Sequence, residues 1–225
     1  MSFAALAACS DGGTGGAADA VALETLEQRS SYAIGMAQAR QLDEVGFELD
    51  RAAFEAAFDD FESGDQRMTD EQMSAAMTEL GERARAEAEA EAQAEREANR
   101  AAGEAYLAEN AARDGVTVTE SGLQYRMLEK GDGATPGADD RVSVHYTGRL
   151  IDGTVFDSSM ERGTPATFGV TQVIRGWTEM LQLMQVGDKV EVTIPSELAY
   201  GEAGRPSIPP NSVLVFEVEL LDIET

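Results

Sequence analysis

Three segments near the carboxyl end of the chain decide its fold. Residues 142–159 read VSVHYTGRLIDGTVFDSS, residues 173–177 read VIRGW, and residues 198–221 read LAYGEAGRPSIPPNSVLVFEVELL. They contribute a set of aromatic and branched aliphatic residues with one carboxylate and two phenol hydroxyls: Tyr146, Phe156, Asp157, Val173, Ile174, Trp177, Tyr200 and Phe216. Such a mixture is typical of an apolar pocket with a few polar groups. We therefore expect these segments to form one binding site.

The same region alternates strand-like and turn-like stretches. Apolar residues recur with a period of two in segments 123–128, 141–150, 189–194 and 213–221. Between the second and third of these, GWTEMLQLMQVGD carries an apolar helical face from Trp177 to Met184, and Gly187-Asp188 ends the predicted helix. This pattern predicts an α+β fold, in which an antiparallel sheet wraps around one short helix.

In motif order and spacing, residues 119–223 resemble the FKBP-type peptidyl-prolyl cis-trans isomerases. The resemblance implies an enzyme that accelerates X-Pro isomerisation without cofactor or metal. Its implied catalytic residues are Asp157, Tyr200, Phe156 and Tyr146, and its implied substrate-binding residues are Trp177, Val173, Ile174, Phe216, Arg162, Ile208 and Phe168. Trp177 would be the floor beneath the substrate proline, while the Ile174 N–H and the Tyr200 hydroxyl would bind substrate carbonyls.

Several of these assignments depend on the family context. A lone tryptophan is usually a core residue, and an aspartate in FDSS is more often a turn residue. Pairing with Arg162 would lower the pKa of Asp157 and keep it ionised. Residues 201–211 would form a flap in which Ile208 touches the residue before proline. Ala166 and Gln172 stand where well-known members often have Phe and Glu, so binding of macrolide inhibitors and sequence preference should differ.

The composition changes near Asp114–Gly115, from Ala, Glu and Met before it to Val, Gly and all six prolines after it. We expect a start and tether in residues 1–20, a helical region in 21–68, a long connecting helix in 69–114 and the isomerase domain in 115–225. Asp50 can cap a helix whose Phe54, Phe58 and Phe61 share one face. So small a helical region needs a partner to be stable.

The segment SSYAIGMAQARQL, residues 30–42, resembles the dimerisation region of bacterial FKBPs of the macrophage-infectivity-potentiator type, which implies a homodimer. Thr69 and Gln72 form a capping box at the start of the long helix. About forty residues at 1.5 Å each would extend about 60 Å. This helix would either space the isomerase domain from the dimer or serve as a linker of no required length.

The formal net charge of -25 excludes binding modes that need a basic surface, both to nucleic acid and to anionic membranes. One cysteine, Cys9, allows no internal disulfide, and one histidine, His145, makes a histidine metal site improbable. We expect His145 to be structural and to face away from Tyr146 on its strand.

Residues 6–9, Leu-Ala-Ala-Cys, resemble a bacterial lipobox followed by a flexible Gly/Ser tether, which makes Cys9 a candidate for lipid attachment. No basic residue precedes Cys9, so a lipoprotein start would be truncated here. The alternative is a disordered cytoplasmic tail. No apolar span of twenty residues exists, so only a lipid would hold the chain at a membrane.

These features favour a homodimeric isomerase of the bacterial periplasm that assists the folding of proline-containing exported proteins. The alternative is a holdase chaperone or binding module whose isomerase activity is secondary. A third reading is an inactive docking domain, against which the intact set of Tyr146, Asp157, Trp177 and Tyr200 argues.

Overall fold

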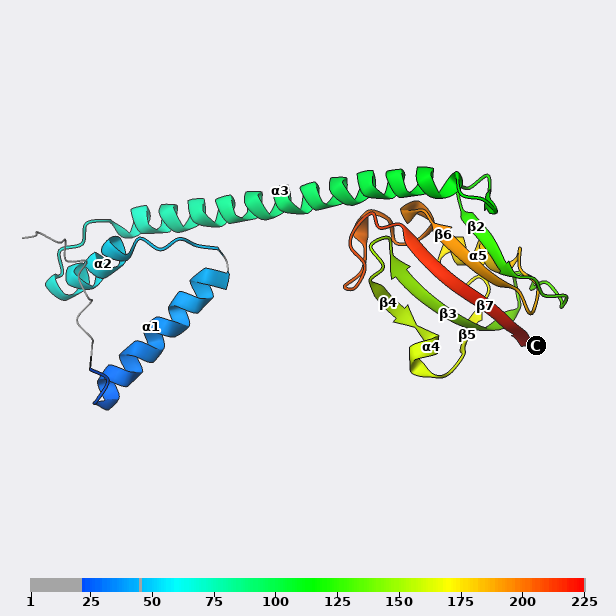
Figure 1. The fold of residues 1–225 in the computed structure, drawn as a ribbon. Helices are drawn as coiled ribbons and strands as arrows, with labels where there is room; N and C mark the ends of the chain where they lie inside the picture. Colours follow the sequence, from blue (N-terminus) through cyan, green and yellow to red (C-terminus); the bar gives the residue numbers. More distant parts are fainter. Residues whose placement is uncertain (1–21, 45, 225) are drawn as a thin grey trace, which may run out of the picture. The chain divides into compact units, whose positions relative to one another are not determined.

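The computed structural model describes residues 22–44 and 46–224 (Figure 1). The chain divides into two compact units, Met1–Ala75 and Ala76–Thr225, and the division falls within the long helix α3 (Asp70–Ala111). Cys9 and its tether lie outside the described residues. No helix in the described ranges combines the length and apolarity that a membrane span requires.

The amino-terminal unit contains helices α1 (Leu26–Glu44) and α2 (Arg51–Ser63). The Asp50 side chain caps α2 by accepting a hydrogen bond from the Ala53 N–H at 3.0 Å, as the sequence predicts. Gly64 ends the helix in the left-handed conformation at φ 74°. Neither helix buries a residue within the single chain, and the side chains of Phe58 and Phe61 are 60% and 81% exposed.

Helix α3 begins with the expected capping box. The Thr69 N–H donates to Oε1 of Gln72 at 2.9 Å, and the Gln72 N–H donates to Oγ1 of Thr69 at 3.2 Å. The helix then runs for 42 residues, and ion pairs such as Arg83–Glu87, spaced four residues apart, support its exposed surface.

The carboxy-terminal part of α3 packs against the sheet. Nδ2 of the buried Asn110 donates to Oε1 of Gln124 at 2.9 Å, and Nε2 of Gln124 donates to the Leu107 carbonyl at 2.9 Å. A Cβ atom at Gly103 would lie 2.8 Å from Cγ2 of Val213, so the close approach needs glycine there. The expected boundary at Asp114–Gly115 marks the change from helix to strand, whereas the compact unit already begins within α3.

The sheet has seven antiparallel strands: β1 (Val116–Val118), β2 (Gln124–Glu129), β3 (Arg141–Leu150), β4 (Val155–Ser158), β5 (Ala166–Gly169), β6 (Lys189–Ile194) and β7 (Leu214–Glu224). Their order is β1-β2-β6-β7-β3-β4, and β5 also pairs with β3. The four predicted strands correspond to β2, β3, β6 and β7. The other three have only three or four residues, too few to show a period of two.

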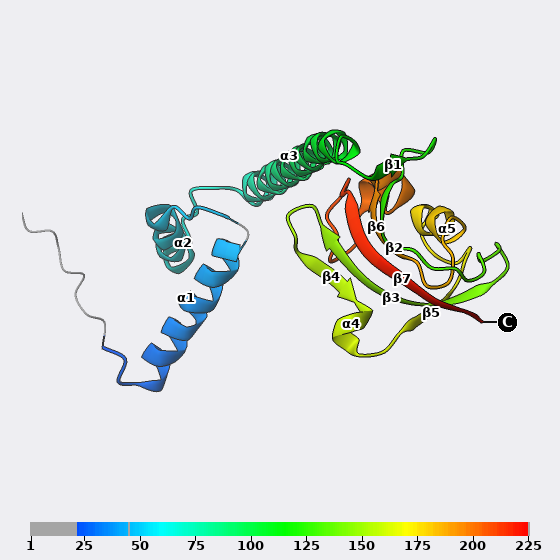
Figure 2. The same ribbon diagram turned by 45° about the vertical axis from the view of Figure 1, so that its right-hand side comes forward.

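Helix α5 (Arg175–Leu181) lies against the concave face of the sheet (Figure 2), with Trp177, Met180 and Leu181 buried. It ends earlier than predicted, before Met184, although the Met184 side chain is fully buried. The chain leaves the helix because the next segment bonds elsewhere: the Val186 N–H donates to the Ala134 carbonyl and the Gly187 N–H to the Leu220 carbonyl.

Short elements complete the unit. Helix α4 (Ser159–Arg162) follows β4, and the 3-10 turns η1 (Ser196–Leu198) and η2 (Gly201–Ala203) connect β6 to the flap. Helix α4 was not predicted. Its cap is local, since Oγ of Ser158 accepts the Glu161 N–H and Gly163 ends it at φ 70°.

Candidate active site

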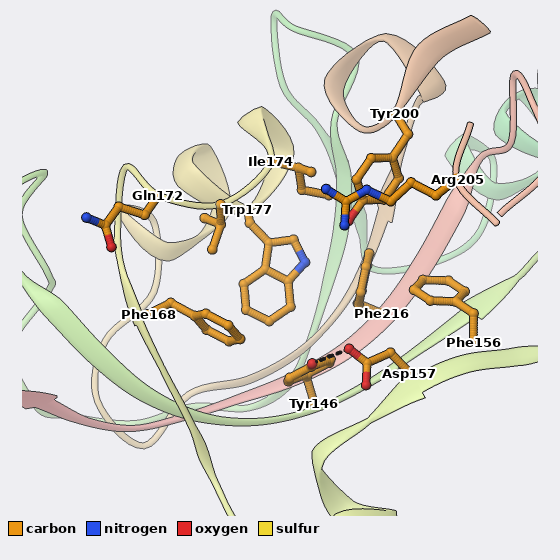
Figure 3. A pocket seen from close by; sticks show the side chains of 11 residues that line it. Tyr146, Phe156, Asp157, Phe168, Gln172, Ile174, Trp177, Tyr200, Arg205 and Phe216 are labelled. Atoms are coloured by element: carbon orange, nitrogen blue, oxygen red, sulfur yellow. Dashed lines mark hydrogen bonds between the residues drawn. The ribbon is translucent and has the colours of Figure 1, made fainter. Parts of the chain in front are cut away.

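A cavity of about 450 Å³ opens on the concave side of the sheet, between the start of α5 and the flap (Figure 3). Strands β3, β4, β5 and β7 each contribute at least one side chain to it. The cavity is lined by Tyr146, Phe156, Asp157, Phe168, Gln172, Val173, Ile174, Trp177, Tyr200, Arg205 and Phe216. Segments 142–159, 173–177 and 198–221 therefore meet at one site, as the sequence predicts.

Trp177 forms the centre of the aromatic lining and is only 5% exposed. Its ring stands edge-to-face with those of Tyr146, Phe216 and Phe168, at centroid distances of 5.2, 5.3 and 5.8 Å. Each such pair adds about 0.5–1.5 kcal/mol to the stabilisation from burial alone. The floor of the pocket is therefore a closely packed aromatic surface.

Gly148 on β3 allows two wall residues to meet. A Cβ atom there would lie 2.6 Å from the Phe216 ring and 2.7 Å from the Phe156 ring. Without it, these rings pack edge-to-face at 5.6 Å. The absent side chain at Gly148 thus shapes one wall of the pocket.

The polar group of the pocket is a triad of Tyr146, Asp157 and Arg162. The Tyr146 hydroxyl donates to Oδ2 of Asp157 at 2.5 Å, and the Arg162 guanidinium binds Oδ1 of the same carboxylate. Nη2 of Arg162 also donates to the Tyr146 hydroxyl at 3.0 Å. Strands β3 and β4 pair directly here, since Gly148 faces Asp157, which brings these side chains together.

The contacts within this triad shift the pKa values of Asp157 and Tyr146. Burial alone would raise the pKa of Asp157, but hydrogen bonds from Tyr146 and Arg162 and the charge of Arg162 outweigh it and lower that pKa below its ordinary value. Burial and the hydrogen bond to the carboxylate raise the pKa of the Tyr146 phenol. At neutral pH the pocket therefore holds an ionised aspartate and a neutral phenol.

Two further donors lie at the cavity. Ile174 is the N-cap residue of α5, and within the described ranges no protein acceptor binds its N–H. The Tyr200 hydroxyl belongs to a lining residue from the segment that leads into η2. Both groups are available to the carbonyl oxygens of a bound chain.

Most predicted residues lie at the cavity, with three exceptions. Arg162 contacts the pocket only through Asp157 and Tyr146 and is absent from the lining. Ile208, expected to touch the substrate, is 4% exposed and packs into the hydrophobic core. Ala166, expected in the variable wall, packs against that core as well, whereas Gln172 does line the cavity.

Arg205 is the lining residue that sequence reasoning missed. Its guanidinium carbon lies 4.6 Å from the centroid of the Tyr200 ring. A basic residue in a Gly- and Pro-rich loop carries no signal of where its side chain points. His145, in contrast, bonds to Oγ of Ser159 at 3.0 Å and is absent from the lining.

In the described part of the chain, no cluster of His, Cys, Asp or Glu side chains could hold a metal ion. The fold and the pocket define the chain as a prolyl isomerase domain with an amino-terminal helical extension. Residues 133–221 match the family model described as FKBP-type peptidyl-prolyl cis-trans isomerase, and residues 27–127 match the domain amino terminal to it. The chain belongs to the FKBP-type peptidyl-prolyl cis-trans isomerases, and it is an enzyme that interconverts cis and trans X-Pro bonds.

Two relatives and one solved structure illustrate this membership. The chain is 50% identical to the FKBP-type 22 kDa peptidyl-prolyl cis-trans isomerase of Escherichia coli, over 89% of this chain and 97% of that protein. It is 40% identical to the outer membrane protein MIP of Legionella longbeachae, over 92% and 90%. The crystal structure of FkpA from Escherichia coli superposes with a TM-score of 0.77 at 37% identity, over 90% of this chain and 99% of that chain.

Proposed function

We propose that the aromatic cavity is the catalytic site and that it acts by stabilising a twisted X-Pro amide. The observation that carries this proposal is the combination of an edge-to-face aromatic floor around Trp177 with an ionised carboxylate held by Tyr146 and Arg162. Two further cavities, one beside Arg100 on α3 and one beside His145 on β3, lack this combination of an aromatic floor and a held carboxylate.

The chemistry requires no bond to be made or broken. Rotation about an X-Pro amide is slow because resonance must be lost, at a barrier of roughly 18–20 kcal/mol. The twisted amide has less charge separation than the planar form, so a dry, apolar pocket favours it over the ground state. Each ~1.36 kcal/mol of such preference raises the rate tenfold.

The residues divide this task between them. The proline ring would lie on Trp177, between the walls made by Phe156, Phe168 and Phe216. The Ile174 N–H and the Tyr200 hydroxyl would bind the neighbouring carbonyls and hold the chain in place. The Asp157 carboxylate would face the carbonyl carbon of the twisting amide, and its ion pair with Arg162 keeps it ionised and oriented.

The test of the site is the double variant Phe156→Ala with Asp157→Ala. We expect kcat/KM for a short prolyl peptide to fall at least tenfold, because the variant loses both a wall and the polar group. The matched control is Val155→Ala with Asp139→Ala, which removes an apolar and an acidic side chain that are exposed and outside the cavity. Unchanged turnover in the first variant, with circular dichroism like that of the control, contradicts the assignment.

We further propose that residues 21–68 form a homodimer and that residues 69–114 carry each isomerase domain away from it. Helices of 19 and 13 residues that bury nothing are unstable alone. In α2, Phe54 and Phe58 stack edge-to-face at 5.4 Å on a face that remains exposed. A second copy of this unit is the simplest cover for that face. The matched FkpA structure, which carries both regions, supports the proposal.

Removal of residues 1–72 tests the arrangement. The truncated protein should be monomeric by light scattering, should turn over short peptides, and should lose activity toward large unfolded substrates, because paired pockets no longer act on one chain. A truncated protein that stays dimeric contradicts the proposed interface.

We propose the bacterial periplasm as the location, with a lipid on Cys9 and exported proteins as substrates. The lipobox-like sequence and the printed name of the outer membrane relative support this. Mass spectrometry of the amino-terminal peptide from the native host is the test: an unmodified Cys9 in a cytoplasmic fraction contradicts it.

A holdase activity is the second candidate function, and the exposed apolar residues of α1 and α2 favour it. If it is separate from isomerisation, the variant Phe156→Ala with Asp157→Ala should still suppress aggregation of an unfolded protein. Loss of both activities together would assign them to one site.

A further inference from the structure

Arg205 projects from the flap toward the cavity, where Figure 3 shows its guanidinium beside the Tyr200 ring. A guanidinium carbon 4.6 Å from the ring centroid is within the range of a cation–π contact, which restricts the side chain while leaving its N–H edge free. Arginine presents five N–H donors in a planar fork that suits a carboxylate.

The flap backbone fixes where Arg205 lies. Its N–H donates to the Ile208 carbonyl at 2.7 Å, and the Ile208 N–H returns a bond to the Arg205 carbonyl at 2.9 Å. These two bonds close a tight turn over Pro206 and Ser207, and proline suits its first central position. Because the Ile208 side chain is buried in the core, it anchors the turn and holds Arg205 at the cavity.

The far end of the flap is held as well. The Asn211 N–H donates to the Gly201 carbonyl at 2.9 Å, which closes the base of the loop. Nδ2 of Asn211 donates to the Arg96 carbonyl on α3 at 3.2 Å, and Nδ2 of Asn99 donates to the Pro210 carbonyl at 2.9 Å. A loop bonded at its turn, at its base and to a helix presents its side chains in a defined geometry.

The charges of the cavity do not cancel. Asp157 and Arg205 are the charged residues of its lining, and Arg162 already neutralises Asp157. Within the described ranges, no carboxylate lies within ion-pair distance of Arg205. The pocket of this strongly acidic protein thus carries one unpaired positive charge at its rim.

We propose that Arg205 is a specificity-determining residue that selects X-Pro sites with an acidic side chain next to the proline. The inference rests on the proposed function, in which the substrate proline occupies this cavity. A glutamate or aspartate adjacent to the proline would pair with the free edge of the guanidinium, while a lysine there would be repelled.

The experiment compares kcat/KM for three peptides that carry Glu, Gln or Lys beside the proline, in one series before it and in another after it. Two-dimensional NMR exchange between the cis and trans forms measures the rates. In at least one series, the wild-type enzyme should favour Glu over Gln by about two- to fivefold, the range of a partly exposed ion pair. High salt should reduce this preference because such a pair is screened.

Three variants decide the question. Arg205→Gln should abolish the preference for Glu, and Arg205→Glu should reverse it in favour of Lys. Arg85→Gln is the matched control, because it removes the same charge from an exposed position on α3 and should keep the wild-type ratio. A Glu/Gln ratio that is the same in Arg205→Glu as in the wild type overturns the proposal.

Failure of this proposal and failure of the proposed function are distinguishable. The pocket assignment fails when Phe156→Ala with Asp157→Ala turns over every peptide at the wild-type rate. The selectivity proposal fails when that double variant is inactive but the peptide ratios do not respond to residue 205. A wild-type enzyme without preference among the peptides in either series also overturns it.

Discussion

The Tyr146 hydroxyl donates a 2.5 Å hydrogen bond to the Asp157 carboxylate, and Arg162 binds both groups. The carboxylate is thereby fixed on two sides before any substrate arrives. Its side chain remains 42% exposed, so it can still contact a bound chain. This arrangement supplies orientation that a lone surface aspartate would lack.

Tyr146→Phe should lower kcat/KM for a short prolyl peptide about fivefold, which corresponds to the loss of a hydrogen bond of about 1 kcal/mol. The aromatic contact with Trp177 would remain, because the ring is kept. Tyr125→Phe is the control, since Tyr125 lies on β2 and outside the cavity lining. NMR exchange measures both rates. If kcat/KM falls equally in the two variants, the assignment of Tyr146 to the site is wrong.

The pH profile of the isomerase should be flat around neutrality. The pKa of Asp157 lies below its ordinary value, so its ion pair adds stability that is present above that ordinary value and lost as pH falls through the lowered pKa. The pKa of Tyr146 lies above the ordinary value of a phenol, so this hydroxyl remains a hydrogen-bond donor throughout the neutral range.

Arg162→Gln removes two of the causes that lower the pKa of Asp157, and it should move the acid limb of the profile upward. Arg85→Gln should leave this limb where it is. The wild-type rate should therefore not change between pH 6 and 8 when the peptide itself has no group that titrates there. A rate that does change in this range would contradict the assignment, because neither Asp157 nor Tyr146 ionises in it.

Gly103→Leu should loosen the packing of α3 on the sheet. Even a Cβ atom at this position would be 2.8 Å from Val213, and overpacking of this kind costs about 1–3 kcal/mol. Gly81→Leu is the matched control in the same helix, where nothing lies within 4 Å of the added Cβ. Denaturant unfolding should show a lower free energy of unfolding for the first variant alone.

Phe58→Glu should convert the proposed dimer into a monomer. The Phe58 side chain is 60% exposed in the single chain, and a charge there would be buried without a partner in an interface. Leu183→Glu is the control, because Leu183 is also exposed, at 46%, but lies in the isomerase domain. Sedimentation equilibrium that reports the same mass for both variants would place the interface elsewhere.

Local signals predicted much of this fold. The cap at Asp50, the reciprocal bonds of Thr69 and Gln72, and the strands 141–150 and 189–194 all occur where the sequence places them. Each rests on residues within one turn or on one strand. Elements too short for a periodic pattern, such as β4 and β5, could not be recognised in this way.

The motifs and their order along the chain were enough to predict the family, the α+β class and most of the residues that line the pocket. The folded chain was needed to show that Ile208 is an anchor in the core while Arg205 faces the cavity, and that the end of α3 belongs with the sheet. These outcomes depend on contacts between residues distant in sequence, such as Asn99 with Pro210 and Asn110 with Gln124. Neither a periodicity nor a local motif encodes which of two neighbouring loop side chains is buried.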